Sequence, residues 1–178
     1  MKFILQRVLD TDTQNGIKDE VDVADSLWGV KTFRTDHEGS AHKEVVDILL
    51  RGPDLDGDDP FNDLYCEDYT TMHSFPRIKS TINDLTISLK MFNVGRIILT
   101  RLAPDGVIYP HVDEGKVPEY YQRFHYVIDD GGDGNLFIIG NSSQRMKTGQ
   151  LWEVDVRQKH AVLNMGERDR VHMIVDLH

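Results

Sequence analysis

Apolar and polar positions alternate in short runs through the second half of the chain. Runs of this period, bounded by clusters of Gly, Asn and Asp, are typical of β-strands. Short strands at near-regular spacing indicate a small antiparallel barrel or jelly roll. The strands are expected at 96–102, 107–113, 123–128, 135–139, 150–156, 160–164 and 170–177.

The first half of the chain is less regular, but it contains two clear elements. A run rich in β-branched residues at 45–50, ended by glycine and proline, predicts a further strand. Residues 16–25 are acidic and polar and show little helical stripe. Within residues 61–92, apolar side chains recur every three or four positions, which predicts a helix on the outside of a sheet. These apolar residues are Ile78, Ile82, Leu85 and Leu89.

Together these elements predict a mainly β fold with flanking helices, a double-stranded β-helix of the jelly-roll, cupin-like kind. At 178 residues, the chain is expected to form one domain, 1–178. Residues 1–92 would supply buttressing strands and helices, and residues 93–178 would form the jelly-roll core.

Composition narrows the class of protein. With 39% hydrophobic and 28% charged residues, the chain resembles a soluble globular protein. A formal charge of −10 argues against a nucleic-acid partner, because phosphate contacts need clustered Lys and Arg. The single cysteine, Cys66, leaves no disulfide framework and no cysteine-based zinc site. Without a signal-peptide pattern or an apolar stretch of membrane-spanning length, we expect a cytoplasmic protein with no membrane partner.

The chemistry is concentrated around His111 and Asp113. They are separated by one residue on a predicted strand, so both side chains project from the same face. A 2-His-1-carboxylate triad needs one more histidine and binds Fe(II) with positions left open. His160, at the start of a later strand, is the candidate third ligand, because a jelly roll brings distant strand ends together. Ordinary surface or core roles are expected for His37, His42, His73 and His178.

Two predicted strands carry a pair of basic residues on one face. Arg170 and His172 share a face of the last strand, and Arg123 and His125 share a face of an earlier one. Alternation alone does not decide whether these faces meet solvent or an interior cavity. If they converge on an interior, they form a positive pocket in which arginine can bind a carboxylate through two hydrogen bonds.

These features together resemble the aspartyl/asparaginyl β-hydroxylase family of Fe(II)- and 2-oxoglutarate-dependent oxygenases. The signal is the HxD pair, a distant histidine, and an arginine ten residues after that histidine at the start of the last strand. The resemblance covers roughly residues 90–178, with a less specific match at 48–51. The matching segments are 102–111, Arg123-x-His125, 149–155, His160 with Asn164, and 170–176.

The resemblance implies that His111, Asp113 and His160 bind Fe(II). Both histidines must be neutral to act as ligands, so metal binding is expected to weaken as the pH falls below the imidazole range. The founding aspartyl hydroxylases have glycine where this chain has Asp113. A complete triad is instead found in relatives that hydroxylate free amino acids, such as certain proline hydroxylases, which points away from the EGF-domain substrate of the founding enzymes.

The resemblance also implies a 2-oxoglutarate site. Arg170 would pair with the distal carboxylate of the cosubstrate, and Thr100 would assist that contact. Arg123 and His125 would lie near the other end of the cosubstrate. Residues 114–122 follow the metal-binding pair directly and form either a lid beside the metal or an ordinary surface loop.

The activity implied is that of a dioxygenase that uses O2 to hydroxylate an amino acid or a peptidyl side chain, with release of succinate and CO2. Two alternatives remain open from the residues alone. One is a cupin-type metalloenzyme that does not use 2-oxoglutarate, which often has an HxH pair that is absent here. The other is a non-enzymatic jelly-roll module that binds a metal or another ligand. The identity of the substrate is not encoded in any recognisable motif.

Overall fold

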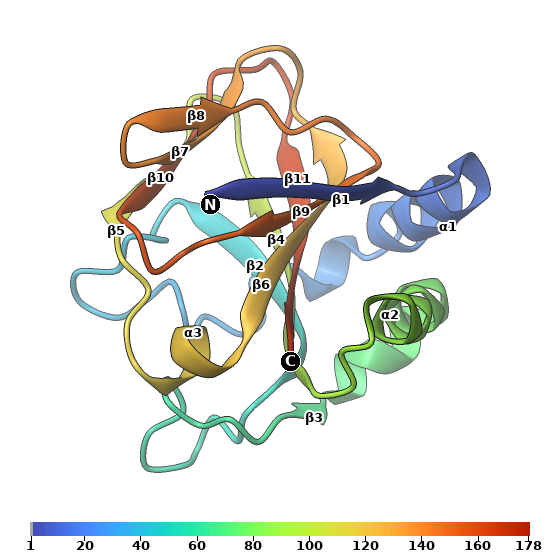
Figure 1. Ribbon diagram of the computed structural model, residues 1–178, viewed down its shortest axis with the longest axis vertical. Helices are drawn as coiled ribbons and strands as arrows, with labels where there is room; N and C mark the ends of the chain where they lie inside the picture. The colour runs from blue at the N-terminus through green and yellow to red at the C-terminus, as the bar shows by residue number, and fades with distance from the viewer. Residues whose placement is uncertain (1) are drawn as a thin grey trace.

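The computed structural model describes residues 2–178 and contains two β-sheets that face each other (Figure 1). The large sheet has the strand order β1-β9-β6-β11-β4-β2-β3, and the small sheet has the order β5-β10-β7-β8. All strand pairs are antiparallel. The strands are β1 (Phe3–Val8), β2 (Val45–Gly52), β3 (Glu67–Asp68), β4 (Val94–Leu102), β5 (Val107–His111), β6 (Gln122–Asp130), β7 (Asn135–Ile139), β8 (Ser142–Gln144), β9 (Gln150–Val154), β10 (His160–Asn164) and β11 (Arg170–Leu177).

The predicted jelly-roll class is confirmed, and every predicted strand is present. Three strands were not predicted: β1 at one edge of the large sheet, and the two- and three-residue strands β3 and β8. Strands β1, β2 and β3, from the first part of the chain, pair into the same large sheet as β4, β6, β9 and β11. The early segment therefore extends the sheet that carries half of the predicted site.

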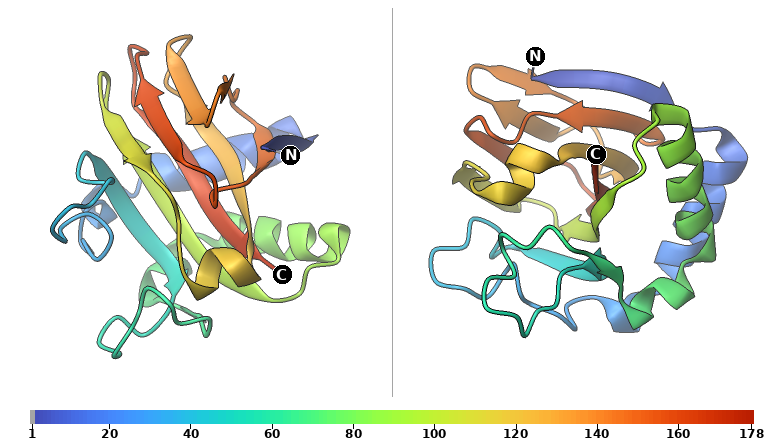
Figure 2. Two further views of the ribbon diagram at one scale, coloured as in Figure 1. Left: turned by 60° about the vertical axis from the view of Figure 1, so that its left-hand side comes forward. Right: turned by 60° about the horizontal axis from the view of Figure 1, so that its bottom comes forward.

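Two helices cover the outer face of the large sheet, α1 (Thr11–Asp22) and α2 (Pro76–Leu89). The views in Figure 2 show them side by side, on the side of the large sheet away from the small sheet. Helix α2 was expected, and its buried residues include Ile78, Ile82 and Leu85. The remaining helical segments are α3 (Lys116–Tyr120) and the 3₁₀ turns η1 (Asp25–Leu27) and η2 (Thr70–Ser74). No helix among residues 2–178 is long and apolar enough to cross a membrane.

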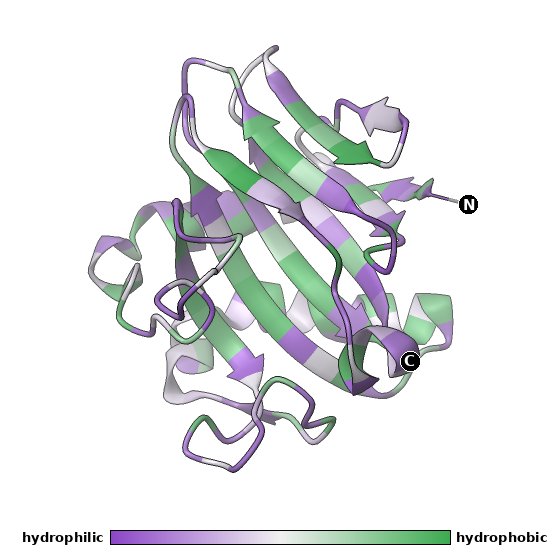
Figure 3. Cartoon of the chain, turned by 90° about the vertical axis from the view of Figure 1, so that its left-hand side faces the viewer, coloured by the Kyte–Doolittle hydropathy of each residue, from purple (hydrophilic) through white to green (hydrophobic). Residues whose placement is uncertain are grey.

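Strand β11 shows how the two faces of the large sheet differ (Figure 3). Its residues Val171, Met173, Val175 and Leu177 belong to the apolar core under the helices. The alternate residues Arg170, His172, Ile174 and Asp176 face the other way and are also buried. The alternation of residues in the sequence left open whether this polar face meets solvent or an interior. The structure shows that it faces an interior, where buried polar groups need partners.

Helix α1 was not predicted, because only Ile17 and Val21 of its residues are buried. It also completes the start of α2, whose N-cap residue Phe75 has no side-chain acceptor. The carboxylate of Glu20 on α1 accepts hydrogen bonds from the backbone N–H groups of Arg77 and Ile78, at 2.5 and 3.0 Å. A carboxylate at this position satisfies N–H groups that lack a partner within the helix.

Replacement of Glu20 by alanine is therefore expected to destabilise the protein by about 1 kcal/mol, the usual effect of losing a helix cap. The measurement is the free energy of unfolding in urea. The neighbouring exposed Asp19→Ala serves as the control, since Asp19 makes no such contact. Equal stability of the two variants would contradict the capping role.

Candidate metal centre and cavity

His111, Asp113 and His160 come together as the sequence predicts. Strands β5 and β10 are neighbours, and His111 lies directly opposite His160 in their register. Nε2 of His111 lies 3.3 Å from Oδ1 of Asp113, and Nε2 of His160 lies 3.9 Å from the same oxygen. One ligand atom from each residue lies within 4.8 Å of the others, so the three can hold a metal ion.

The two imidazoles are oriented for metal binding through Nε2. Nδ1 of His111 lies 2.7 Å from the backbone oxygen of Tyr109, and Nδ1 of His160 lies 3.0 Å from that of Gln158. A carbonyl only accepts, so the proton sits on Nδ1 and the lone pair on Nε2. Nε2 of His111 is buried without a hydrogen-bond partner. Burial lowers the pKa of His160 to about 4, so this ring is neutral at pH 7.

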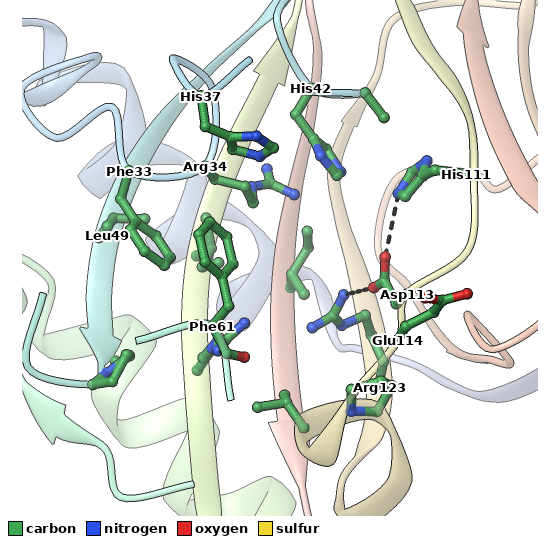
Figure 4. Close-up of a pocket in the computed structure, with 18 of the residues that line it drawn as sticks. Phe33, Arg34, His37, His42, Leu49, Phe61, His111, Asp113, Glu114 and Arg123 are labelled. Atoms are coloured by element: carbon green, nitrogen blue, oxygen red, sulfur yellow. Dashed lines mark hydrogen bonds and ion pairs between the residues drawn. The ribbon is translucent and has the colours of Figure 1, made fainter. Parts of the chain in front are cut away.

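Asp113 is held by an arginine from the large sheet. Arg123 on β6 donates from Nη1 to Asp113 and forms two hydrogen bonds of 2.8 Å with Asp176 on β11. Burial is the largest single influence and opposes ionisation of Asp113, but the Arg123 guanidinium together with His111 and His160 outweighs it and holds the pKa of that carboxyl well below its usual range. The carboxylate is therefore ionised, as a metal ligand requires. Figure 4 shows Asp113 between His111 and Arg123.

Arg170 is a buried cation with no counterion in this structure. It is 2% exposed, and no carboxylate of residues 2–178 forms an ion pair with it. Its Nη2 donates to Nδ1 of His172 at 3.0 Å, which places the ring proton of His172 on Nε2. Nε of Arg170 and Nε2 of His172 are both buried without partners. Burial lowers the pKa of Arg170 to about 9, so the guanidinium is still charged at pH 7.

Thr100 lies on β4 directly opposite His172 on β11. Its hydroxyl oxygen accepts a hydrogen bond of 3.2 Å from Nη2 of Arg34, which leaves the hydroxyl proton free to donate. Thr100, His172 and Arg170 thus supply three donors from two adjacent strands. Three converging donors, one of them cationic, suit a carboxylate ligand.

Comparison with known proteins identifies the family of this chain. The sequence profile described as aspartyl/asparaginyl beta-hydroxylase matches residues 15–178. The chain belongs to that family. No curated protein matches the chain in sequence. Membership of this family identifies the protein as an oxygenase of the hydroxylase kind.

Solved structures with a similar fold include oxygenases. A prolyl hydroxylase from Trichoplax adhaerens, in complex with a hypoxia inducible factor peptide fragment, has a TM-score of 0.67 and 10% identity; the match covers 99% of this chain and 83% of that one. A 2OG-Fe(II) oxygenase family oxidoreductase from Burkholderia pseudomallei has a TM-score of 0.57 and 12% identity, over 75% of this chain. This chain spans 65% of the length of that protein. At such identities the likeness shows a shared fold.

A cavity of about 380 Å³ opens beside the metal residues (Figure 4). His111, Asp113 and Arg123 form one side of it. Phe33 and Phe61, stacked with ring centroids 4.2 Å apart, form the other. Arg170, His172 and His125 do not line this cavity, because they lie deeper in the fold. The centroid of the His125 ring lies 5.2 Å from that of Phe137 on the small sheet, which places His125 between the two sheets.

The predicted site residues fall into four groups. The metal residues converge, and Thr100 and Arg170 lie on adjacent strands of the large sheet, together with His172. His125 lies between the sheets, with its ring centroid 5.8 Å from that of His172 and its Nδ1 unpaired. Arg123 is engaged by two aspartates, and its contact with the cosubstrate stays a prediction.

The segment 114–122 forms part of the cavity wall. Glu114, Val117 and Pro118 are among the lining residues, as a lid beside the metal requires. Tyr121 is instead anchored, since its hydroxyl donates to the backbone oxygen of Leu64 at 2.8 Å. This segment is therefore fixed at its C-terminal end.

Sequence reasoning missed several residues of the site. His42 was expected to have an ordinary role, but it lines the cavity and packs edge-on against His111, with centroids 4.6 Å apart. Arg34 lines the cavity and forms a bidentate pair with Asp47, at 2.9 and 3.0 Å. The available signal was Asp47 itself, a carboxylate in the apolar run 45–50, because a buried charge needs a partner. The contacts of His42 and Arg34 depend on loop packing and leave no periodic pattern.

Proposed function

We propose that this protein is a dioxygenase that uses Fe(II) and 2-oxoglutarate to hydroxylate an amino acid or a peptidyl side chain. The observation that carries the proposal is the combination of the metal triad with Arg170, a buried cation that lacks a counterion. Burying an unpaired charge is costly, so the site is expected to bind an anion. Membership of the hydroxylase family supports 2-oxoglutarate as that anion.

The residues present fit an iron ion bound by His111, Asp113 and His160. When bound, the iron supplies the redox chemistry that couples decarboxylation of 2-oxoglutarate by O2 to hydroxylation of a C–H bond, with succinate and CO2 as products. The protein holds both imidazole rings through their Nδ1 contacts and fixes Asp113 through Arg123. Outer contacts of this kind set ligand orientation and metal affinity.

The cosubstrate would be held by its distal carboxylate. Arg170, the Nε2–H of His172 and the hydroxyl of Thr100 would donate to it, in a dry environment where such contacts are strong. These contacts orient the cosubstrate and take no part in bond breaking, so their contribution is positioning. The substrate would enter from the cavity, whose wall includes His111 and Asp113.

The test is anaerobic addition of Fe(II) and 2-oxoglutarate to the purified protein, followed by exposure to O2. We expect a visible charge-transfer absorption band before O2 is added, and release of succinate afterwards. Binding of 2-oxoglutarate without succinate release would favour a binding module. Metal binding with neither a band nor succinate would favour a metalloenzyme that does not use 2-oxoglutarate.

A further inference from the structure

Arg96, in the wall of the cavity, is a second cation without a carboxylate partner. Its Nη2 donates to the backbone oxygens of Pro60 and Phe61, at 3.0 and 2.7 Å. Its Nε is buried and has no hydrogen-bond partner. Within residues 2–178, none of the ion pairs includes Arg96. Backbone carbonyls satisfy hydrogen bonds, but they do not neutralise the charge.

The other arginines of the cavity wall differ from Arg96, because each is paired with at least one aspartate. The pairs are Arg34 with Asp47, Arg51 with Asp68, and Arg123 with Asp113 and Asp176. An anion that enters the cavity therefore meets one wall arginine that forms no direct ion pair with any carboxylate of residues 2–178. Burial, with the nearby Arg123 cation, lowers the pKa of Arg96, and Asp176 and Asp113 offset only part of this effect.

The position of Arg96 relates its distance from the metal residues to the size of a ligand that could contact both. Arg96 lies on β4 and Arg123 on β6, and β11 runs between these two strands. Two strand spacings separate their backbones by about 10 Å. Arg123 in turn contacts the metal ligand Asp113. A molecule that pairs with Arg96 and extends toward the metal residues therefore crosses roughly this span.

Asp176 on β11 lies between the two arginines, and the surface beside it is apolar. Leu49, Ile98 and Ile174 lie on adjacent strands in matching register, so their side chains form one patch on the inner face of the sheet. All three line the cavity, with the stacked rings of Phe33 and Phe61. A volume of about 380 Å³ lies at the small end of the range for ligand pockets, which suits a molecule of amino-acid size.

We propose that the substrate is a small apolar acid, whose free carboxylate pairs with Arg96 and whose hydrocarbon side chain lies on Leu49, Ile98 and Ile174. This inference rests on the proposed function, because it names the substrate class of the same site. Such a carboxylate occurs on a free amino acid and on the C-terminal residue of a peptide. A residue within a peptide chain has none.

The test compares leucine, isoleucine and phenylalanine with their primary amides, which lack only the carboxylate. Binding is measured by calorimetry on the protein loaded with Mn(II) and 2-oxoglutarate. We expect each acid to bind roughly 30-fold or more tightly than its amide, the effect of losing one partner of a buried charge pair. Dipeptides that end in the same residues, tested in parallel, distinguish a peptide C-terminus from a free amino acid.

The Arg96→Gln variant is expected to bind acid and amide equally, and Arg96→Lys to retain part of the preference. The ratio of acid to amide affinity isolates charge recognition, since a merely structural role of Arg96 would weaken both ligands together. Exposed Arg145→Gln is the control. Equal affinity of acids and amides in the wild-type protein, binding of neither, or an unchanged preference in Arg96→Gln would each overturn the inference. The charge-transfer band of the wild-type protein tests the oxygenase assignment separately.

Discussion

Replacement of Arg170 by methionine is expected to lower the affinity for 2-oxoglutarate by at least about 100-fold, because removing one partner of a buried charge pair costs roughly 3–5 kcal/mol. The same variant is expected to match or exceed the stability of the wild-type protein without cosubstrate. Methionine loses the hydrogen bond to His172, worth about 1 kcal/mol. It also removes a buried unpaired charge, which costs several kcal/mol.

Thermal unfolding with and without Mn(II) and 2-oxoglutarate measures both effects. The wild-type melting temperature should rise when the cosubstrate binds, and that of Arg170→Met should not. Exposed Arg145→Met provides the matched control for loss of one positive charge. If Arg170→Met kept the cosubstrate-dependent rise, Arg170 would not be the carboxylate anchor. A large fall in the melting temperature of the unliganded variant would mean that the native charge is already balanced.

Replacement of His160 by alanine is expected to weaken Fe(II) binding by more than about 100-fold, since loss of an outer contact alone typically costs 10- to 100-fold. The fold should survive, because His160 lies at the first position of β10 and its backbone pairing with β7 does not depend on the ring. The measurement is anaerobic titration with Fe(II), together with circular dichroism of the variant.

The control for His160→Ala is His73→Ala, because His73 is exposed and lies in the 3₁₀ turn η2, outside the cavity lining and the metal group. Both variants lose one imidazole, but only one of them loses a ligand of the proposed site. Equal Fe(II) affinity in the two variants would remove His160 from the metal centre.

Most strands of the two sheets could be predicted from the sequence, because the alternation of apolar and polar residues follows the burial of alternate side chains. In β11 the alternation of apolar and polar residues separates the face under the helices from the face toward the site. Helix α1 was not predicted, because it buries only Ile17 and Val21 and so leaves almost no apolar periodicity in the sequence. Strand β1 was missed because it lies at the edge of the sheet and has no fully buried residue in its pattern.

The candidate metal centre was predictable because His111 and His160 lie on strands that a jelly roll brings together; Asp113 follows the end of β5 rather than lying on the predicted strand. His111 and Asp113 are close in sequence, and His160 pairs directly with His111. The cavity wall was not predictable in the same way. Phe33 and Phe61 come from two loops, and their stacking follows from tertiary packing rather than from any periodic pattern. The sequence predicts Arg96 only as the first residue of a strand. That it forms no ion pair within residues 2–178 depends on tertiary packing.

Phe137 lies between the candidate metal residue His160 and His125, which is predicted to lie near the cosubstrate. Its ring centroid lies 5.9 Å from that of His160 and 5.2 Å from that of His125. The metal ligand His160 belongs to the small sheet and Arg170 to the large one, so no single strand fixes the distance between them. That distance is set by the thickness of the apolar layer between the sheets, to which Phe137 contributes a full aromatic ring. With the metal at His160 and the cosubstrate at Arg170, as proposed above, hydrophobic packing sets the distance that the cosubstrate spans, and a smaller residue at 137 would change that distance without removing a ligand.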